Sequence, residues 1–73
     1  MPKSLNSTLK TLGRKIQRLR KAQKITQEEL AEMVGISRVY MGYIEQGRES
    51  PSLKLLMKLS KKMGVKVEDL FHK

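Results

Sequence analysis

The organisation of this chain follows from residues 26–47, which read TQEELAEMVGISRVYMGYIEQG. Thr26 is a good helix N-cap residue, and Glu29 three positions later completes a capping box. Gly35 stands where a helix can end in the left-handed conformation that glycine adopts at little cost. Ser37 can cap a second helix. Gly47 can end that helix in the same way as Gly35 ends the first. The pattern predicts two short helices joined by a tight turn.

The two sides of the second helix differ in character. Met41 and Ile44 are three residues apart and point inward together. Helices this short need a helical scaffold to bury such faces. The opposite side is not the lysine- and glutamate-rich surface of an ordinary solvated helix. It carries Arg38, Val39, Gly42, Tyr43 and Gln46. Because an α-helix fits the major groove of DNA, this side is predicted to read DNA.

The charge of the chain indicates a polyanionic partner. Sixteen lysines and arginines against seven acidic residues give a formal net charge of +9 and a pI near 10.2. The alternative is an excess of lysine that serves only solubility. The distribution favours a nucleic acid, because residues 1–25 hold eight basic groups and residues 53–66 hold five lysines, with no acid in either segment. This arrangement is typical of a phosphate-binding periphery around a base-reading centre.

Helical periodicity extends over the segment before this motif. Leucine and isoleucine recur every three or four residues up to Leu19, which predicts a first helix that begins near Ser7 or only near Thr11. We expect residues 1–8 to form a flexible N-terminal arm and residues 9–73 to form one domain. The expected inner face of the first helix is Leu9, Leu12, Ile16 and Leu19.

Helical signals also follow the motif. Ser52 can cap a helix over Leu53–Met63, and a last short helix is expected near the C-terminus. The predicted inner stripe of the longer helix is Leu53, Leu56, Leu59, Ser60 and Met63. Leu55 and Met57 fall off this stripe and are either exposed leftovers or, with Phe71, a dimer patch. No segment shows the alternation of apolar and polar residues with period two that indicates a β-strand. The predicted fold class is therefore all-α, with five helices.

No catalytic or metal site is predicted. The chain has no cysteine, which excludes thiolate ligands and is compatible with a reducing cytoplasm. The only histidine, His72, has no partner ligands, and the serines have no histidine base. There is no glycine-rich phosphate loop, signal peptide or membrane span. We therefore expect no enzyme, no cofactor and no membrane contact. Since no domain follows Phe71 in this sequence, we also expect no small-molecule ligand.

Several short motifs occur together along the chain. They are Leu19-Arg20, TQEELA at 26–31, GIS at 35–37, IEQG at 44–47, Pro51-Ser52 and GVKVEDLF at 64–71. In combination they resemble the phage-repressor-like helix-turn-helix domain of the Cro/C1, or XRE, family, over Leu12–Phe71. The resemblance implies a compact, lambda-repressor-like fold of five helices. It also implies a helix-turn-helix at about 27–46, whose second helix, at about 38–46, enters the major groove.

The resemblance further implies roles for individual residues. Base edges would be contacted by Arg38, Val39, Gly42 and Tyr43. DNA phosphates would be contacted by Gln27, Ser37, Tyr40, Gln46, Arg48 and Arg14. Arg20 and Glu45 would form an internal ion pair. Gly42 has two interpretations: it lets the helix backbone approach DNA closely, or it is a tolerated defect in the helix.

Three functions are compatible with these features. The first is a regulator, expected to be a repressor, that binds specific double-stranded DNA as a homodimer on half-sites about 34 Å apart. The second is an antitoxin-like or adaptor module that binds proteins through the predicted patch. The third is non-specific coating of nucleic acid, which predicts a steep salt dependence and no preferred site. The mixed recognition face disfavours the third function, because binding by charge alone would favour lysine there.

Overall fold

The computed structural model describes residues 5–72. Within that range the chain forms four α-helices and one 3₁₀-helix, and no strand. The elements are α1 (Leu5–Ala22), α2 (Gln27–Val34), α3 (Arg38–Glu45), α4 (Leu53–Met63) and η1 (Val67–Phe71). The predicted all-α class is confirmed. The count differs slightly from the expected five helices, because the fifth helical segment is a 3₁₀-helix.

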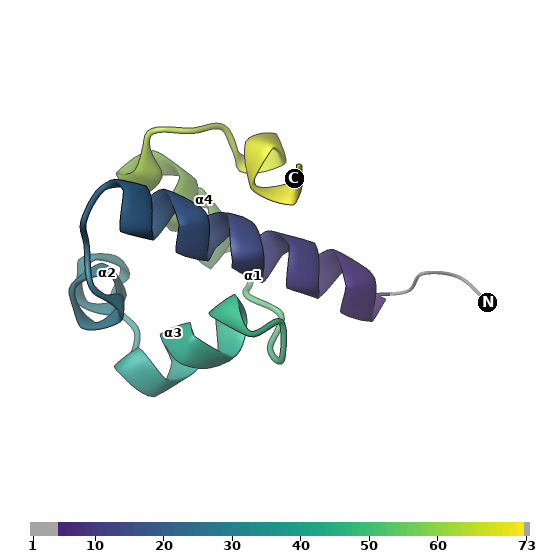
Figure 1. Ribbon diagram of the computed structural model, residues 1–73, viewed down its shortest axis with the longest axis horizontal. Coiled ribbons are helices and arrows are strands. Elements are labelled where there is room, and N and C mark those ends of the chain that lie inside the picture. The colour runs from purple at the N-terminus through teal and green to yellow at the C-terminus, as the bar shows by residue number, and fades with distance from the viewer. Residues whose placement is uncertain (1–4, 73) are drawn as a thin grey trace.

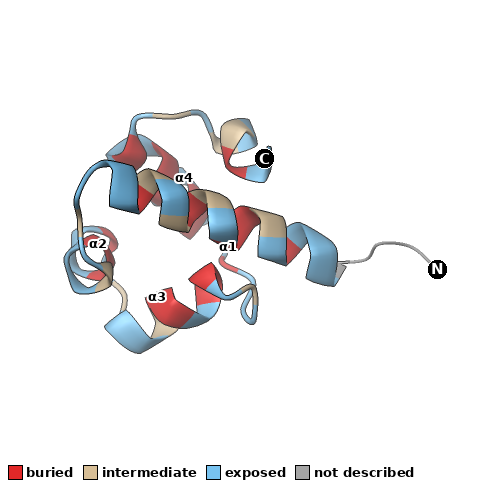
Figure 2. Cartoon of the chain, in the orientation of Figure 1, coloured by how far each residue is buried: buried red, intermediate tan, exposed pale blue. Residues whose placement is uncertain are grey.

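The long helix α1 runs through the middle of the molecule (Figure 1). It packs against α3 and η1, while α2 packs against α3 and α4. Buried positions lie on the sides of the helices that face the interior, and the outer sides are exposed (Figure 2). The buried apolar core is made of Leu9, Leu12, Ile16, Leu30, Ala31, Val34, Met41, Ile44, Leu55, Leu56, Leu59, Met63 and Leu70.

The first helix begins earlier than predicted. A start near Ser7 or Thr11 was expected, but α1 runs from Leu5, so residues 5–8 of the predicted arm are helical. Leu9 is buried, which fixes an early turn of the helix against the core and lets the helix extend by one further turn. Residues 1–4, the rest of that arm, lie outside the described residues.

The predicted caps form as local chemistry requires. The Thr26 hydroxyl accepts the backbone N–H of Glu29 at 3.0 Å, and the Glu29 carboxylate accepts that of Thr26 at 2.9 Å. The Ser37 hydroxyl accepts a backbone N–H from the first turn of α3 at 3.0 Å. Gly35 is left-handed, with φ of 79°, and the N–H of Ile36 returns to the last turn of α2. These bonds set the tight turn between α2 and α3.

The inner stripe predicted for α4 was wrong at two positions. Leu53 is 65% exposed and Leu55 is buried. Leu55 faces the turn between α2 and α3, where it lines a hollow with Gly35 and Ile36, whereas Leu53 is the first residue of the helix and lies beyond the edge of the core. The sequence had suggested that Leu55 could belong to an exposed dimer patch. Because Leu55 is buried, it does not.

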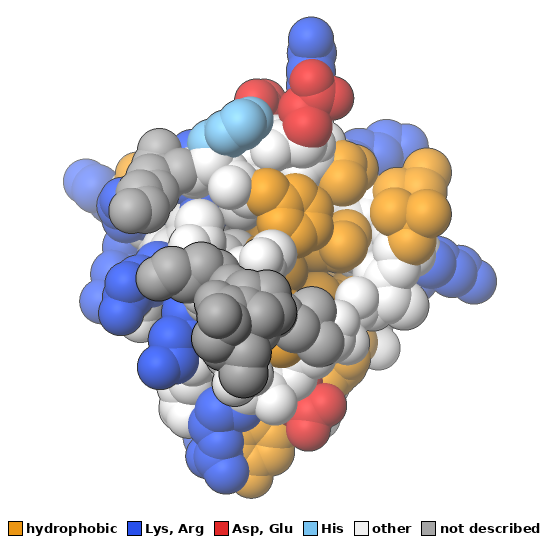
Figure 3. All heavy atoms as spheres, turned by 90° about the vertical axis from the view of Figure 1, so that its right-hand side faces the viewer, with side chains coloured by type: hydrophobic (Ala, Val, Ile, Leu, Met, Phe, Trp, Pro, Cys, Tyr) orange, Lys and Arg blue, Asp and Glu red, His pale blue; other side chains and the backbone are white. Residues whose placement is uncertain are grey.

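Exposed apolar side chains remain in the part of the described chain that follows α3. They are Leu53 and Met57 on α4 and Phe71 on η1. Figure 3 shows hydrophobic side chains gathered in one area of the end of the molecule that carries the N-terminus of α1, with charged groups around it. This end thus offers an apolar surface that the monomer does not cover.

The last helical segment lacks a side-chain cap at its N-terminus. Lys66 stands at its N-cap position and its ammonium group cannot accept a hydrogen bond. Within residues 5–72, the side-chain bond at this end is the one in which the Asp69 carboxylate accepts the Lys66 backbone N–H, at 3.1 Å. A run of five residues in 3₁₀ conformation is already long for that geometry.

Candidate nucleic-acid interface

The outward side of α3 is the centre of the candidate interface. Arg38 is exposed, Val39 is 53% exposed and Tyr43 is 37% exposed. With Gly42, which is itself buried, they stand at positions i, i+1, i+4 and i+5 of one helix, so they lie on one side of it. Single exposed apolar residues are ordinary on protein surfaces. An arginine, a valine and a tyrosine presented together on a protruding helix are instead the groups that contact guanine, thymine methyl groups and sugars.

Gly42 has no packing reason to be glycine. A Cβ built on it would meet only the Gln27 side-chain oxygen, at an ordinary 3.9 Å. A methyl group would therefore fit within the monomer, and glycine in a helix costs roughly 0.5–1 kcal/mol relative to alanine. The residue lowers helix stability without relieving any contact inside the protein.

Behind this face lies a buried ion pair. Arg20 Nε donates to Glu45 Oε2 at 2.7 Å, and Arg20 Nη2 donates to Glu45 Oε1 at 3.0 Å. Both residues are buried, and Arg20 Nη1 also donates to the Ile25 carbonyl at 2.8 Å. Among the residues that the structure describes, no buried side-chain nitrogen or oxygen lacks a partner. The pair that the resemblance implied thus ties the end of α1 to the end of α3.

Gln27 joins this pair to the recognition face. Its Nε2 donates to Glu45 Oε1 at 2.9 Å, and its Oε1 accepts from Arg38 Nη1 at 3.0 Å. The family resemblance implies that Gln27 contacts a DNA phosphate and braces the helix that follows the turn. The structure shows that brace as the bond to Arg38, a partner that the sequence did not name.

A second arginine is held at the other end of α3. The Arg48 guanidinium carbon lies 4.6 Å from the centroid of the Tyr43 ring, a cation–π arrangement. At an exposed site such a contact contributes about 0.5–1 kcal/mol. Arg48 Nη1 also lies 3.5 Å from Gln46 Oε1. One face of the Tyr43 ring is therefore covered by Arg48.

The other predicted phosphate contacts come from several elements of the structure. Gln27 and Ser37 stand at the N-terminal ends of α2 and α3, where backbone N–H groups also point outward. The Ser37 oxygen accepts the cap bond, so its hydroxyl proton is still available to a phosphate. Tyr40 is half-buried against the core. Arg14 is exposed on α1 and is the one predicted phosphate contact outside the helix-turn-helix and the loop after it.

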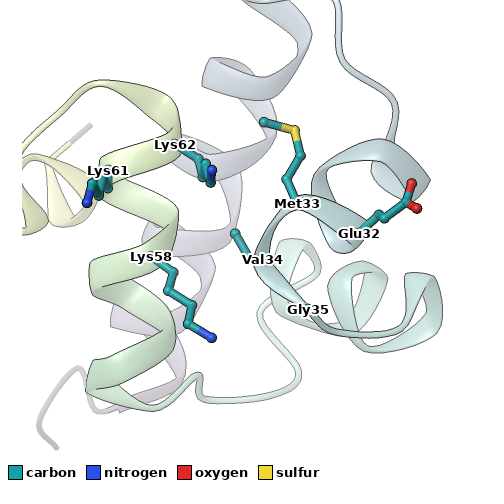
Figure 4. Close-up of a pocket in the computed structure, with 7 residues that line it drawn as sticks. All are labelled: Glu32, Met33, Val34, Gly35, Lys58, Lys61 and Lys62. Carbon is teal, nitrogen blue, oxygen red and sulfur yellow. The ribbon is translucent and has the colours of Figure 1, made fainter.

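A separate hollow of about 420 Å³ lies between the end of α2 and α4 (Figure 4). It is lined by Glu32, Met33, Val34, Gly35, Lys58, Lys61 and Lys62. None of the four predicted base-contacting residues lines it, so it is distinct from the face of α3.

The described residues offer neither a group that could hold a metal ion nor a helix that could span a membrane. Between residues 5 and 72 no three His, Cys, Asp or Glu side chains are grouped so that they could hold a metal ion. Over the same range no helix has both the length and the apolar character needed to cross a bilayer.

Comparison with known proteins gives the family. The helix-turn-helix family model HTH_3 matches residues 16–70. This chain belongs to that helix-turn-helix family. It is 46% identical, over 78% of its length and 86% of the relative, to an HTH-type transcriptional regulator of Methanocaldococcus jannaschii. The predicted membership of a Cro/C1-type helix-turn-helix family is confirmed.

Two further similarities concern a repressor and a DNA complex. The chain is 40% identical to the immunity repressor protein of Bacillus phage phi105, over 78% of this chain but only 40% of the repressor. Its structure is similar to that of the biofilm master regulator SinR in complex with DNA, with a TM-score of 0.77 and 32% identity over 84% of this chain and 98% of that one. The helix-turn-helix of this chain therefore has the fold of a protein that has been seen on DNA.

Proposed function

We propose that this helix-turn-helix protein is a transcriptional regulator that represses by binding a specific site in double-stranded DNA. The observation that carries the proposal is the outward side of α3. There Arg38, Val39 and Tyr43 are exposed on a helix whose other side is fixed in the core and whose N-terminus is capped. In the major groove Arg38 would grip guanine O6 and N7, while Val39 would press on a thymine methyl group.

The surroundings of α3 suit the phosphate backbone. Ser37 and Gln27, at two helix N-termini, would donate to phosphates, as would Tyr40, Gln46 and Arg48. The acid-free basic segments on either side of the motif would add the sequence-independent attraction that depends on salt. A protein of this kind acts by binding and not by catalysis, and it would work in the cytoplasm, where its DNA lies.

We also propose that two copies bind together. Leu53 and Met57 are 65% and 55% exposed and stand one turn apart on α4, so they form one apolar strip. Phe71, at 38% exposed, is a further exposed apolar group, on η1. Closure of this surface against a second copy would give a two-fold symmetric dimer, whose recognition helices would face half-sites about 34 Å apart.

The proposal is tested by selecting bound duplexes from a random pool at roughly physiological ionic strength, where screening weakens non-specific contacts. We expect a two-fold symmetric site to be enriched. The Arg38→Ala variant should lose the preference for one base pair in each half-site. Arg18→Ala is the matched control, because Arg18 is also an exposed arginine but lies on α1. It should keep the site.

One outcome of the selection would contradict the proposed function. Retained binding at low salt with no enriched site would contradict the proposed regulator. In that case the exposed apolar strip becomes the stronger feature, and the antitoxin-like or adaptor function is the one to pursue.

A further inference from the structure

A groove lies between α2 and α4, apart from the outward side of α3. The hollow of about 420 Å³ between these helices has Met33 and Val34 on its α2 side and three lysines on its α4 side (Figure 4). A second hollow, of about 240 Å³, adjoins it, because Val34, Gly35 and Lys58 line both. Together they form one depression along α4, which we call the α2–α4 groove. Of the predicted DNA contacts, only Tyr40 reaches it, in the smaller hollow.

The α4 side of the groove carries a stripe of lysines. The members of this lysine stripe are Lys54, Lys58, Lys61 and Lys62. All four are exposed and stand at positions i, i+4, i+7 and i+8 of α4, so they share one side of the helix over about 12 Å. Within residues 5–72 the ion pair is the one between Arg20 and Glu45, so no described carboxylate neutralises the stripe. Glu32, across the groove, points away from the lysines (Figure 4).

The needs of the helix explain only half of the stripe. Lys61 and Lys62 lie in the last turn of α4, where the helix dipole favours positive charge. Lys54 lies in the first turn, where the dipole disfavours it. Lys58 stands four residues from both Lys54 and Lys62, and like charges at that spacing destabilise a helix. The helix α4 therefore carries a repulsion that a negatively charged neighbour would relieve.

The floor of the groove is apolar. Met33 is 42% exposed, Val34 lies between the two helices, and the half-buried Ile36 lines the smaller hollow (Figure 4). Phosphates are bound by charge and hydrogen bonds, so a nucleic acid would gain nothing from such a floor. An apolar side chain that covered it would gain from the surface removed from water. The groove thus combines a basic side with an apolar floor, which suits a chain that is both acidic and apolar.

We propose that the α2–α4 groove binds an acidic amphipathic helix of another protein. Its apolar side chains would lie on Met33 and Val34, and carboxylates one turn apart on its flank would face the lysine stripe. The groove follows α4 over both hollows, which suits an elongated helix better than a compact ligand. This inference goes beyond the proposed function, because it assigns a protein partner to a surface other than the outward side of α3. It does not depend on a DNA site.

The probe is a pair of synthetic peptides of about 15 residues, long enough to form about four helical turns. One has leucine at helical spacing and glutamate at the other positions. The second has alanine in place of each leucine, which keeps the charge and does not lower helix propensity. Each is titrated into the full ¹⁵N-labelled chain at roughly physiological salt, and backbone amide shifts give the site and the affinity. We expect the leucine peptide to shift amides of residues 32–36 and 54–62 and to bind more tightly than the alanine peptide.

Charge reversal tests the lysine stripe. Lys58→Glu with Lys62→Glu should weaken binding of the leucine peptide about tenfold, because two charge contacts become repulsive. Arg18→Glu with Lys21→Glu is the matched control, since both residues are exposed on α1 and neither lines the groove. It changes the net charge by the same amount and should keep the affinity within about twofold. Should the first variant not fold, Lys54→Glu with Lys58→Glu replaces it, because that pair avoids the last turn of α4.

Substitution of the floor tests the apolar contact. Met33→Gln keeps the approximate length of an exposed side chain and makes its end polar. It should weaken the leucine peptide about threefold and leave the alanine peptide unchanged, because contacting groups are not additive. Such coupling would locate the leucines of the peptide on Met33, which attraction by charge alone cannot do.

Three results would overturn the proposal. Equal affinities for the leucine and alanine peptides, or equal losses in the two charge-reversed variants, would reduce the binding to general attraction by a basic protein. Amides of the groove that shift with a scrambled DNA duplex, more than those of α3 do, would make nucleic acid its occupant. Groove amides that shift with protein concentration in the absence of peptide would assign the surface to a second copy of this chain.

Discussion

Gly13 of α1 lies directly against the backbone of Glu45 at the end of α3. A Cβ on Gly13 would lie 2.5 Å from the carbonyl oxygen of Glu45 and equally close to that of Ile44. Both are backbone atoms of a helix end, so neither can move aside cheaply. The close crossing of α1 and α3, which supports the recognition helix, therefore depends on the absence of a side chain at this position.

The Gly13→Ala variant is expected to be less stable, although helix propensity alone predicts a gain of about 0.5–1 kcal/mol. Overpacking typically costs about 1–3 kcal/mol, and here the obstacle is backbone, so we expect a loss in the upper part of that range. Urea unfolding followed by circular dichroism would measure it. A variant more stable than the wild type would show that α1 and α3 can separate freely.

The Gly42→Ala variant is expected to behave in the opposite way. A methyl group fits beside Gln27, so the free energy of unfolding should rise by roughly 0.5–1 kcal/mol. Affinity for the selected DNA site should fall several-fold, because DNA is then the remaining neighbour of this face. Unfolding and DNA titration of the same preparation would measure both quantities. Higher stability with unchanged affinity would instead favour the tolerated-defect interpretation.

Local chemistry explains what the sequence could predict. Thr26, Ser37 and Ser52 each accept a backbone N–H from a residue three positions later, so their partners lie within the same turn and are visible in the sequence. The left-handed Gly35 and Gly64 likewise follow from where each helix must stop. These signals located the helix-turn-helix and the start of α4 to within a residue or two.

Contacts between helices explain what the sequence could not predict. Residues 53–57 of α4 contain four apolar side chains in five positions, so periodicity does not decide which of them face inward. The turn between α2 and α3 decides it by receiving Leu55. The hold of Gln27 on Arg38 spans eleven residues and depends on the angle between two helices. In the candidate site, residue types on the surface were therefore predictable, whereas the bonds that position them were not.

Substitutions on α4 test the corrected stripe. Leu55→Ala removes a buried side chain and should lower the free energy of unfolding by about 2–4 kcal/mol. Leu53→Ala changes a residue that is 65% exposed and should stay within about 0.5 kcal/mol of the wild type. Thermal or urea unfolding at a low protein concentration, where the monomer prevails, compares the two. Equal losses would mean that Leu53 packs inside.

The turn between α1 and α2 carries a strained residue. Lys24 has a φ of 59°, in the left-handed region that costs a residue with a Cβ about 1–2 kcal/mol. Lys24→Gly should therefore be more stable than Lys24→Ala, by roughly 0.5–1 kcal/mol after the greater chain entropy of glycine is allowed for. Both variants remove the same charge, so the difference between their unfolding midpoints isolates the backbone effect. No difference would show that this turn relaxes.

The two arginines at the ends of α3 should differ in how they act on DNA. Arg38 points from the face that also carries Val39 and Tyr43, so Arg38→Ala should relax the preference at one base pair. Arg48 lies just after α3 in the chain, and its guanidinium stacks on the Tyr43 ring. We expect the positive charge of Arg48 to lie near the phosphate backbone of bound DNA. Arg48→Ala should weaken binding to all sequences alike and reduce the salt slope of log K by about 1.

Titrations of the selected site and of a scrambled duplex at several salt concentrations would separate the two effects. Tyr43→Leu serves as the control for Arg48, because it removes the ring on which the guanidinium stacks but leaves the positive charge in place. Its salt slope should stay near the wild-type value even where affinity falls. If Arg48→Ala instead altered the preferred sequence and left the slope unchanged, Arg48 would contact a base and not a phosphate.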